Sequence, residues 1–214
     1  MTTDRGQKTR EKVLHAAMGL FAEHGLHGVT TRDIAKAADV NIATIHYHVG
    51  TKEELYMEVF RRGYAREILI TKQFIDNIQA TSFRDKEKLR KAVCDFVDAV
   101  VDLNVEDPNL ARLSIWRMIT QDDQAQQIDK MFNLPMYKQI SEYIAQGLKR
   151  QPDTSENVDL RFFFSGFNWM LYGLITSGVI DFEQARVPIE GEEMVQKMKD
   201  FLYAYCFTYF GIDG

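Results

Sequence analysis

Proline is missing from the first half of this chain, and this absence strongly narrows the folds that the chain can adopt. The first of its 4 prolines is Pro108, so no earlier residue lacks a backbone donor or carries the ring that breaks helices. Apolar residues recur there at three- and four-residue steps, and no stretch alternates apolar and polar residues long enough to favour a sheet. We therefore predict an all-α protein of about nine helices.

Capping residues divide the first 80 positions into four predicted helices. Gly25 can end the first helix, and a second follows residues 30–31. Residues 39–40 make a tight connection, after which Asn41 is a good N-cap for a third helix that reaches about residue 48. The sequence Thr-Lys-Glu-Glu at residues 51–54 is typical of a capping box, so a fourth helix should run from there to about residue 80.

The second half of the chain continues this helical pattern around its prolines. An apolar stripe over residues 89–100 predicts one helix, and Pro108 stands where the next should begin. Pro135 is expected to split the following helical stretch into two. The acidic residues 153–156 should start a long helix that reaches about residue 177, and a final helix follows Pro188.

Charge and aromatic content separate a small head from a larger body. Residues 1–52 hold seven Lys or Arg and five Asp or Glu, whereas the other residues hold 19 and 26. Only two of the 25 aromatic residues lie in the head. This asymmetry predicts two domains with separate roles, at residues 1–52 and 53–214. Within the head, Arg5, Lys8 and Arg10 are expected to form a flexible basic arm.

Residues 162–180 contain no charged residue and are long enough to be considered as a membrane span. Their flanks are Asp159 and Asp181 rather than a positive cluster, and the segment includes three glycines and several polar residues. We interpret it as a helix with one face on the body and the other on a partner, with no membrane contact. The first eight residues lack an apolar signal segment, so we expect a cytoplasmic, reducing location.

Residues 31–48 have the pattern of two short helices joined by a tight turn. Ala35 is small enough for the helices to touch, and Ile34 and Ile45 are spaced to lock the pair onto the first helix. The outer face is polar, and an α-helix fits the major groove of DNA with its early residues near the base edges. The predicted DNA-binding residues are Thr31, Arg32, Asn41, Ile42, Ala43, Thr44, His46, Tyr47, His48 and Lys52.

The surrounding residue string is Gly25-x-x-Gly28-x-Thr30-Thr31-x-x-Ile34-Ala35-x-x-Ala38-x-Val40, followed by Tyr47-x-Val49-x-x-Lys52-Glu53-x-Leu55. Over about residues 9–60 it resembles the DNA-binding head of the tetracycline-repressor (TetR) family of bacterial regulators. Asp39 and Ala43 stand where that family usually has Gly, His46 takes a usual Tyr position, and Val49 replaces a usual Phe. These departures concern the operator sequence rather than the fold.

The resemblance implies a ligand-responsive regulator that is not an enzyme, with a helix-turn-helix DNA-binding domain at 1–52 and a helical effector-binding and dimerisation domain at 53–214. Such proteins are homodimers that bind an inverted-repeat operator in double-stranded DNA, and the resemblance favours a repressor, with an activator as the alternative. The last two long helices, here about 155–177 and 190–210, should form a four-helix dimer interface. The central helices should enclose a cavity for an unknown, largely apolar effector, whose binding shifts the fourth helix and changes the spacing of the two recognition helices.

Aromatic, Met and polar residues of the body are the candidates for this cavity and interface. The predicted effector-pocket residues are Phe96, Trp116, Arg117, Met131, Phe132, Phe163, Phe167, Asn168 and Met170. The predicted dimer-interface residues are Gly166, Trp169, Gly173, Ser177, Met198, Phe201 and Tyr205. A buried Arg117 would favour a carboxylate or phosphate on the ligand.

Other classes of function find less support in the sequence. No Gly-rich phosphate loop, nucleophile elbow or HExxH motif points to an enzyme, and we expect no cofactor. The two histidine pairs, His24 with His27 and His46 with His48, lack the cysteine or acidic residues that would complete a metal site. Cys94 and Cys206 are expected to be buried apolar thiols. A dimeric helical adaptor with a vestigial head stays open as an alternative, and sequence-specific DNA binding separates it from a regulator.

Overall fold

The computed structural model describes residues 4–80, 85–120, 122–148, 160–183 and 186–212. Its helices are α1 (Asp4–His24), α2 (Thr31–Ala37), α3 (Ile42–Val49), α4 (Lys52–Gln79), α5 (Lys86–Glu106), α6 (Pro108–Ile119), α7 (Asp123–Ile128), the π-helical turn η1 (Asp129–Asn133), α8 (Leu134–Leu148), α9 (Leu160–Ser177) and α10 (Gly191–Phe210). Because α7, η1 and α8 follow one another without a break, these residues form nine helical bodies. The prediction of an all-α protein is confirmed.

Three short-range caps account for the starts of α2, α3 and α4. Thr30 and Thr51 each form a capping box, in which the residue three positions later bonds back to the cap. The Asn41 side chain accepts a hydrogen bond from the backbone N–H of Thr44 at 2.7 Å. Each cap satisfies a donor that the first turn of a helix leaves open. The turn before α3 places Asp39 at φ +52°, a left-handed conformation that Asp tolerates better than most residues.

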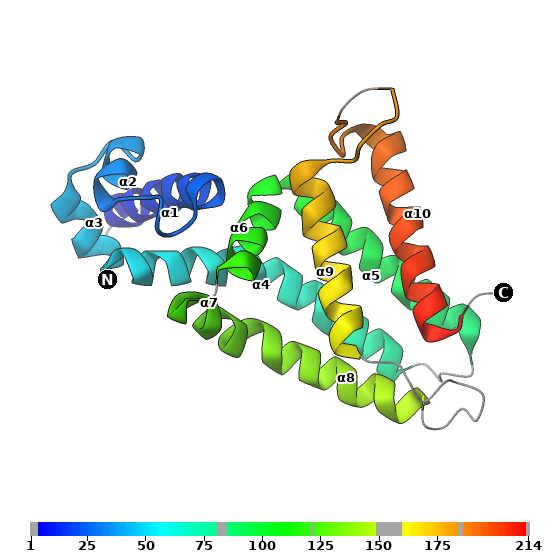
Figure 1. Cartoon of the computed structure of the whole chain (residues 1–214). Coiled ribbons are helices and arrows are strands. Elements are labelled where there is room, and N and C mark those ends of the chain that lie inside the picture. Colours follow the sequence, from blue (N-terminus) through cyan, green and yellow to red (C-terminus); the bar gives the residue numbers. More distant parts are fainter. Residues whose placement is uncertain (1–3, 81–84, 121, 149–159, 184–185, 213–214) are drawn as a thin grey trace.

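The helices α1, α2 and α3 gather at one end of the molecule, and α4 leads from them into the rest of the chain, passing behind α6 and above α7 and α8 in the view of Figure 1. The buried side chains of this head include Phe21 from α1, Ile34 from α2 and Ile45 from α3. Each is fully buried, as expected for the inward positions of amphipathic helices. The core of the head is completed by α4 and by Leu113 of α6 and Ile128 of α7.

The body packs α5, α8, α9 and α10 around the second half of α4 (Figure 1). Val97 of α5, Leu171 of α9 and Leu202 of α10 lie at the centre of this second core. Phe74 and Ile78 contribute from α4. The uncharged segment at 162–180 is thus largely accounted for by α9, one face of which is buried against the body.

The helix α4 contributes to both cores. Leu55 and Phe60 are buried with the head, whereas Phe74 and Ile78 are buried with the body. The division into residues 1–52 and 53–214 stays a prediction about roles, because the packing places the first turns of α4 in the core of the head. The helix α4 therefore links the two cores directly.

Pro135 does not split its helical stretch as we predicted. The chain stays helical from residue 123 to residue 148, and only the pitch changes, in the π-helical turn that ends at Asn133. A wider turn before proline accommodates both the missing N–H and the bulk of the ring. The predicted helix start at 153–156 lies outside the described residues, whereas the predicted end at Ser177 is confirmed.

A carboxylate on α4 fastens α1 to that helix. Glu58 accepts hydrogen bonds from Arg61 at 2.7 and 2.8 Å, from Arg10 of α1 at 2.9 Å and from Arg62 at 3.0 Å. Arg62 also bonds to Glu11 of α1 at 2.5 Å. These guanidinium groups, Arg61 first, lower the pKa of Glu58 to about 2.

We expect Glu58→Gln to lower the free energy of unfolding at neutral pH by about 1–2 kcal/mol, after allowance for solvent screening. Because the pKa of Glu58 is depressed in the folded state, its contribution is present above about pH 4.5 and is lost as the pH falls through about 2. Urea unfolding from pH 7 to 2 should show the variant and the parent converging at the acidic end. Glu142→Gln, at an exposed carboxyl of α8, is the matched control; a difference from the parent that does not change with pH would contradict this account.

Candidate nucleic-acid interface and ligand cavity

The joint between α2 and α3 orients the exposed face of α3. Ile34 and Ala35 of α2 and Ile45 of α3 point inward, and the backbone N–H of Val40 bonds to the carbonyl of Ala35 at 3.0 Å. The turn between the helices is tight because Asp39 adopts a left-handed conformation. With its inner side fixed in this way, α3 presents its other side to solvent.

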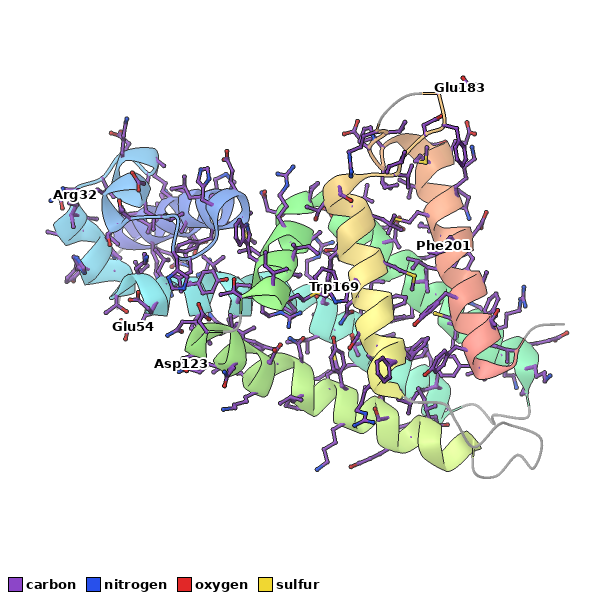
Figure 2. The ribbon with its side chains drawn as sticks, viewed as in Figure 1. Arg32, Glu54, Asp123, Trp169, Glu183 and Phe201 are labelled. Atoms are coloured by element: carbon purple, nitrogen blue, oxygen red, sulfur yellow. The ribbon has the colours of Figure 1, made fainter. Side chains whose placement is uncertain are left out.

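The predicted DNA-binding residues lie together on α2, α3 and the start of α4. Tyr47 is the most prominent, with 85% of its side chain exposed. Ile42, Ala43 and His46 are also exposed, whereas Thr31, Thr44 and His48 are half-buried. Arg32 lies at the outer end of the head (Figure 2). This surface combines hydroxyl, imidazole, phenol and guanidinium groups, which can bond to bases or phosphates.

Four members of this set, Asn41, Thr44, His46 and Lys52, have hydrogen-bond partners within the chain, and the Nδ1 atom of His46 lies 3.2 Å from the carbonyl oxygen of Gly50. The Lys52 ammonium group donates to the carbonyl oxygens of Leu26 and Val29, both at 2.9 Å, and so fastens the loop before α2 to the start of α4. The amide oxygen of Asn41 accepts from the Thr44 hydroxyl at 2.9 Å as well as from its backbone N–H. Sequence reasoning anticipated the Asn41 cap but not the bonds of Lys52, which join residues distant in the sequence.

The predicted flexible arm is wrong for the described residues. Arg5, Lys8 and Arg10 lie within α1, which begins at Asp4. Arg10 is held by Glu58 at 2.9 Å. The helical spacing that we assigned to residues 13–21 extends further toward the N-terminus, because these charged residues are good helix formers.

An enclosed cavity of about 60 Å³ lies in the body beside α4. Its wall is mainly apolar, from α4, α5, α8, α9 and α10, and the lining residues are Glu67, Thr71, Phe74, Val93, Phe96, Val100, Asn133, Met136, Tyr137, Ile140, Ile144, Phe163, Phe164, Phe167, Asn168, Leu171, Tyr172, Cys206 and Phe210. Few polar groups in a mostly apolar wall are typical of small-molecule sites.

Glu67 is the ionisable carboxyl group in this wall. Its side chain is buried and accepts a hydrogen bond from the Asn104 amide at 3.0 Å. The Tyr172 hydroxyl lies 3.3 Å from both carboxylate oxygens. Burial raises the pKa of Glu67 above its usual value. A charge at this position therefore requires a partner to offset its desolvation.

A wider, more open groove of about 590 Å³ adjoins the cavity. Asn133, Tyr137 and Asn168 line both spaces, and the Asn168 amide bonds to the Tyr137 hydroxyl at their junction. Arg117 lies in the wall of the groove, where its guanidinium pairs with Asp129. The hydrogen bond between Tyr137 and Asn168 thus lies where the apolar cavity meets the more polar groove.

Four of the predicted pocket residues line the cavity, namely Phe96, Phe163, Phe167 and Asn168, and Arg117 lines the groove. The other four predicted pocket residues line neither the cavity nor the groove. Trp116 faces the head, and Met131 is exposed on the surface. Phe132 packs with the core of the head, and Met170 packs in the body core without lining the cavity. Helical spacing finds the buried side of a helix but cannot tell which of two cores the side chain meets.

Sequence reasoning missed Glu67 and Thr71, which form the polar side of the α4 wall. The signal was present in the spacing, because Phe60, Glu67, Thr71, Phe74 and Ile78 recur at helical steps along one buried stripe. A carboxyl group inside an apolar stripe is rarely buried without a partner. A carboxyl group at such a position is therefore a candidate binding residue.

The outward face of α9 and α10 is apolar and open. Phe162, Trp169 and Phe201 have 75%, 47% and 52% of their side chains exposed, and Figure 2 labels Trp169 on α9 and Phe201 on α10. A side chain at Gly173 would meet no atom within 4 Å, and Ser177 is exposed. Four of the predicted interface residues therefore lie on the surface.

Three predicted interface residues serve the packing of the chain itself. Met198 is only 4% exposed and belongs to the body core. Tyr205 donates its hydroxyl proton to the carbonyl of Phe163 at 3.1 Å, and this hydroxyl lies where a side chain at Gly166 would be. The small residue therefore admits a tyrosine of the neighbouring helix, and both Gly166 and Tyr205 are half-buried.

The head and the body meet at Trp116. Its indole N–H donates to the carbonyl of Ala22 in α1 at 3.1 Å, and its ring packs against Gly25. Nearby, the ring nitrogen Nε2 of His27 lies 2.7 Å from a carboxylate oxygen of Asp122, at the start of α7. These contacts join the loop after α1 to α6 and α7, two helices that also reach the groove.

The remaining candidates have ordinary packing roles. Burial raises the pKa of the Cys206 thiol to about 12, and burial likewise raises the pKa of Cys94. Across the part of the chain that the structure describes, no three His, Cys, Asp or Glu side chains come close enough to hold a metal ion. In the same residues, no helix combines the length and hydropathy needed to cross a bilayer.

Residues 13–59 match the family described as bacterial regulatory proteins, tetR family. An alignment of 55 residues is 42% identical to the HTH-type transcriptional dual regulator CecR of Shigella flexneri. This alignment covers 26% of this chain and 24% of that protein. A second alignment, of 65 residues, is 35% identical to the HTH-type transcriptional repressor AcnR of Corynebacterium efficiens. It covers 30% of this chain and 35% of that protein. The chain thus matches about a quarter to a third of the length of these curated relatives.

A likeness over the whole chain appears among solved structures. The structure of AibR in complex with isovaleryl coenzyme A and operator DNA has a TM-score of 0.64 and 14% sequence identity to this chain. The alignment covers 92% of this chain and 96% of that one. At this level of identity, the likeness shows a shared fold.

The joint between head and body predicts opposite effects at two glycines. At Gly25, with φ at +67°, an added side chain would come within 2.9 Å of Trp116, so Gly25→Ala should lower the free energy of unfolding by about 1–3 kcal/mol. At Gly19, inside α1, the added methyl would meet nothing within 4 Å. Gly19→Ala should therefore raise it by about 0.5–1 kcal/mol. Urea unfolding measures the free energy of unfolding of both variants. Equal effects at the two sites would contradict the close contact between Gly25 and Trp116.

Proposed function

We propose that this chain is a ligand-responsive transcriptional repressor of the tetR family of bacterial regulatory proteins, the family that residues 13–59 match. It binds an inverted-repeat operator in double-stranded DNA as a homodimer and is released by a small-molecule effector. The proposal assigns no catalytic step to the chain. The observation that carries it is the exposed polar face of α3, held in place by the turn at Asp39.

The proposed DNA contacts follow from which atoms are free on that face. Tyr47 and His46 are exposed on α3, and Arg32 is exposed on α2. These side chains can reach base edges or phosphates once α3 enters a major groove. Lys52 contributes positive charge close to the backbone while it holds the loop before α2, so its removal would also disturb that loop.

The proposed dimer uses the exposed apolar face of α9 and α10. Phe162, Trp169 and Phe201 would lie against the same residues of a second copy, because a two-fold interface is self-complementary. Such a dimer presents two copies of α3, and the operator half-sites would lie one helical turn of DNA or a multiple apart.

The proposed effector site is the cavity beside α4. Because α4 belongs to the cores of both head and body, a ligand that prefers a different position of α4 would change the placement of the heads. AibR, which shares the fold, has been solved with both isovaleryl coenzyme A and operator DNA, and this supports a ligand-responsive role here.

We expect Tyr47→Ala and His46→Ala each to weaken operator binding by about tenfold to a hundredfold, the range for loss of a good base contact. A random pool of double-stranded DNA, selected against the wild-type protein, would supply the operator, and fluorescence anisotropy would measure affinity. Phe182→Ala, an exposed aromatic residue between α9 and α10, is the control and should bind normally. Unchanged affinity in both α3 variants, or no enriched inverted repeat, would refute the proposed recognition helix.

We expect Phe201→Asp to convert the dimer to monomers, because it places a charge at the centre of an apolar interface. Leu69→Asp, at an exposed apolar residue of α4, should leave the dimer intact. Sedimentation velocity would measure the oligomeric state, and the monomeric variant should also lose operator affinity. A Phe201→Asp protein that sediments as the parent does would place the interface on another surface.

A further inference from the structure

The wall of the cavity contains an acidic side chain and no basic one. The inference drawn from this wall rests on the proposed function, because it names the class of effector. Glu67 lines the cavity, whereas no Lys, Arg or His occurs among the described residues of its lining. Arg117 lines the adjoining groove, where it pairs with Asp129, and its buried Nε has no hydrogen-bond partner among the described residues. The lining of the cavity itself thus offers a carboxyl group and no basic side chain.

Hydrogen bonding around Glu67 also leaves acceptors in excess. Asn104 donates to Glu67 at 3.0 Å and to the carbonyl of Val100 at 2.9 Å, so both of its amide hydrogens are used. Its Oδ1 atom is buried and has no partner among the described residues. Thr71 donates its hydroxyl proton to the backbone carbonyl of Glu67 at 2.8 Å, so its oxygen can still accept. Asn104 is not part of the cavity lining, so the acceptors offered to a ligand at this end are those of Glu67 and Thr71, and a suitable ligand brings donors.

Aromatic rings provide the rest of the wall. Phe96 lies with its ring centre 4.7 Å from that of Phe74 and 5.9 Å from that of Phe167. The faces of aromatic rings attract cations, and the attraction grows where water is excluded. The same wall can therefore accept both the charged end and the apolar body of one ligand.

We propose that the cavity binds a small organic amine, with its ammonium group against the Glu67 carboxylate and its aromatic or branched aliphatic body among the phenylalanine rings. The ammonium group supplies the missing donors and the missing positive charge together. From Arg117 in the sequence we expected a ligand with a negative carboxylate or phosphate, and this assignment gives the ligand the opposite charge. The reason is that Asp129 neutralises Arg117, whereas Glu67 lines the cavity.

The size of the cavity fixes how such a ligand would sit. About 60 Å³ is well below the roughly 150 Å³ of a cavity that holds benzene. The ammonium end therefore occupies the chamber, while the remainder extends past Tyr137 and Asn168 into the groove of about 590 Å³. Entry of the ligand breaks the hydrogen bond between those two side chains. Because Glu67 belongs to α4, the charged end of the ligand then contacts that helix directly.

Three probes with one phenylethyl body test the charge preference: 2-phenylethylamine, neutral 2-phenylethanol and anionic 3-phenylpropanoate. NMR titration of the purified full-length protein, without DNA, would give their dissociation constants. We expect the amine to bind about tenfold more tightly than the alcohol, as for a hydrogen-bonded charge, and the anion to bind most weakly. Tightest binding of the anion, equal binding of amine and alcohol, or binding of none of the three would overturn the proposal.

Two variants assign the preference to Glu67. Glu67→Gln keeps the shape and removes the charge, so the ratio of amine to alcohol affinity should fall to about one, while the alcohol binds as before. Tyr172→Phe removes a donor to the carboxylate but leaves the charge, so the amine preference should persist. An unchanged ratio in Glu67→Gln would contradict the assignment, and the wild-type comparison stands even where a variant fails to fold. Operator binding is measured separately, so its failure would refute the proposed repressor without changing the result for the cavity.

Discussion

The burial of α4 in two separate cores is the constraint on which the rest of this structure depends. Its first turns are held by the head, through Leu55 and Phe60, and its last turns by the body, through Phe74 and Ile78. Close packing makes each half expensive to displace alone, because interiors tolerate few voids. A helix fixed at both ends moves most readily as one rigid rod, and this property suits it to carry a signal.

Between the two cores lies a polar layer that a purely structural protein would have little reason to keep. Tyr64 bonds to Ser114 at 2.8 Å, Glu67 bonds to Asn104, and Arg117 pairs with Asp129. Each of these groups gives up hydration on burial, and apolar side chains of similar volume would often be as stabilising. The layer separates the head core from the body core and borders both the cavity and the groove, so its polarity is available for recognition.

Local chemistry explains which parts of this molecule could be predicted from the sequence. The caps at Thr30, Asn41 and Thr51 depend on neighbours within a few positions, and the left-handed turn at Asp39 depends on one residue, so these were predictable. The bonds of Lys52, the contact of Trp116 with the head and the burial of Met198 depend on helices distant in the sequence. Periodicity identifies the buried side of a helix, but the identity of the covering helix is set by tertiary packing. For that reason Phe96 and Phe167 could be placed correctly, whereas Phe132 could not.

The π-helical turn Asp129–Asn133 gives the binding region a means of variation that leaves the frame intact. Because a π-helical turn holds about one residue more than an α-helical turn, it absorbs that residue locally. Loss of one residue there would restore a regular α-helix and leave Tyr137 and Ile140 in the wall of the cavity. The length of the chain can therefore change by one residue at this turn while the face of α8 keeps its register.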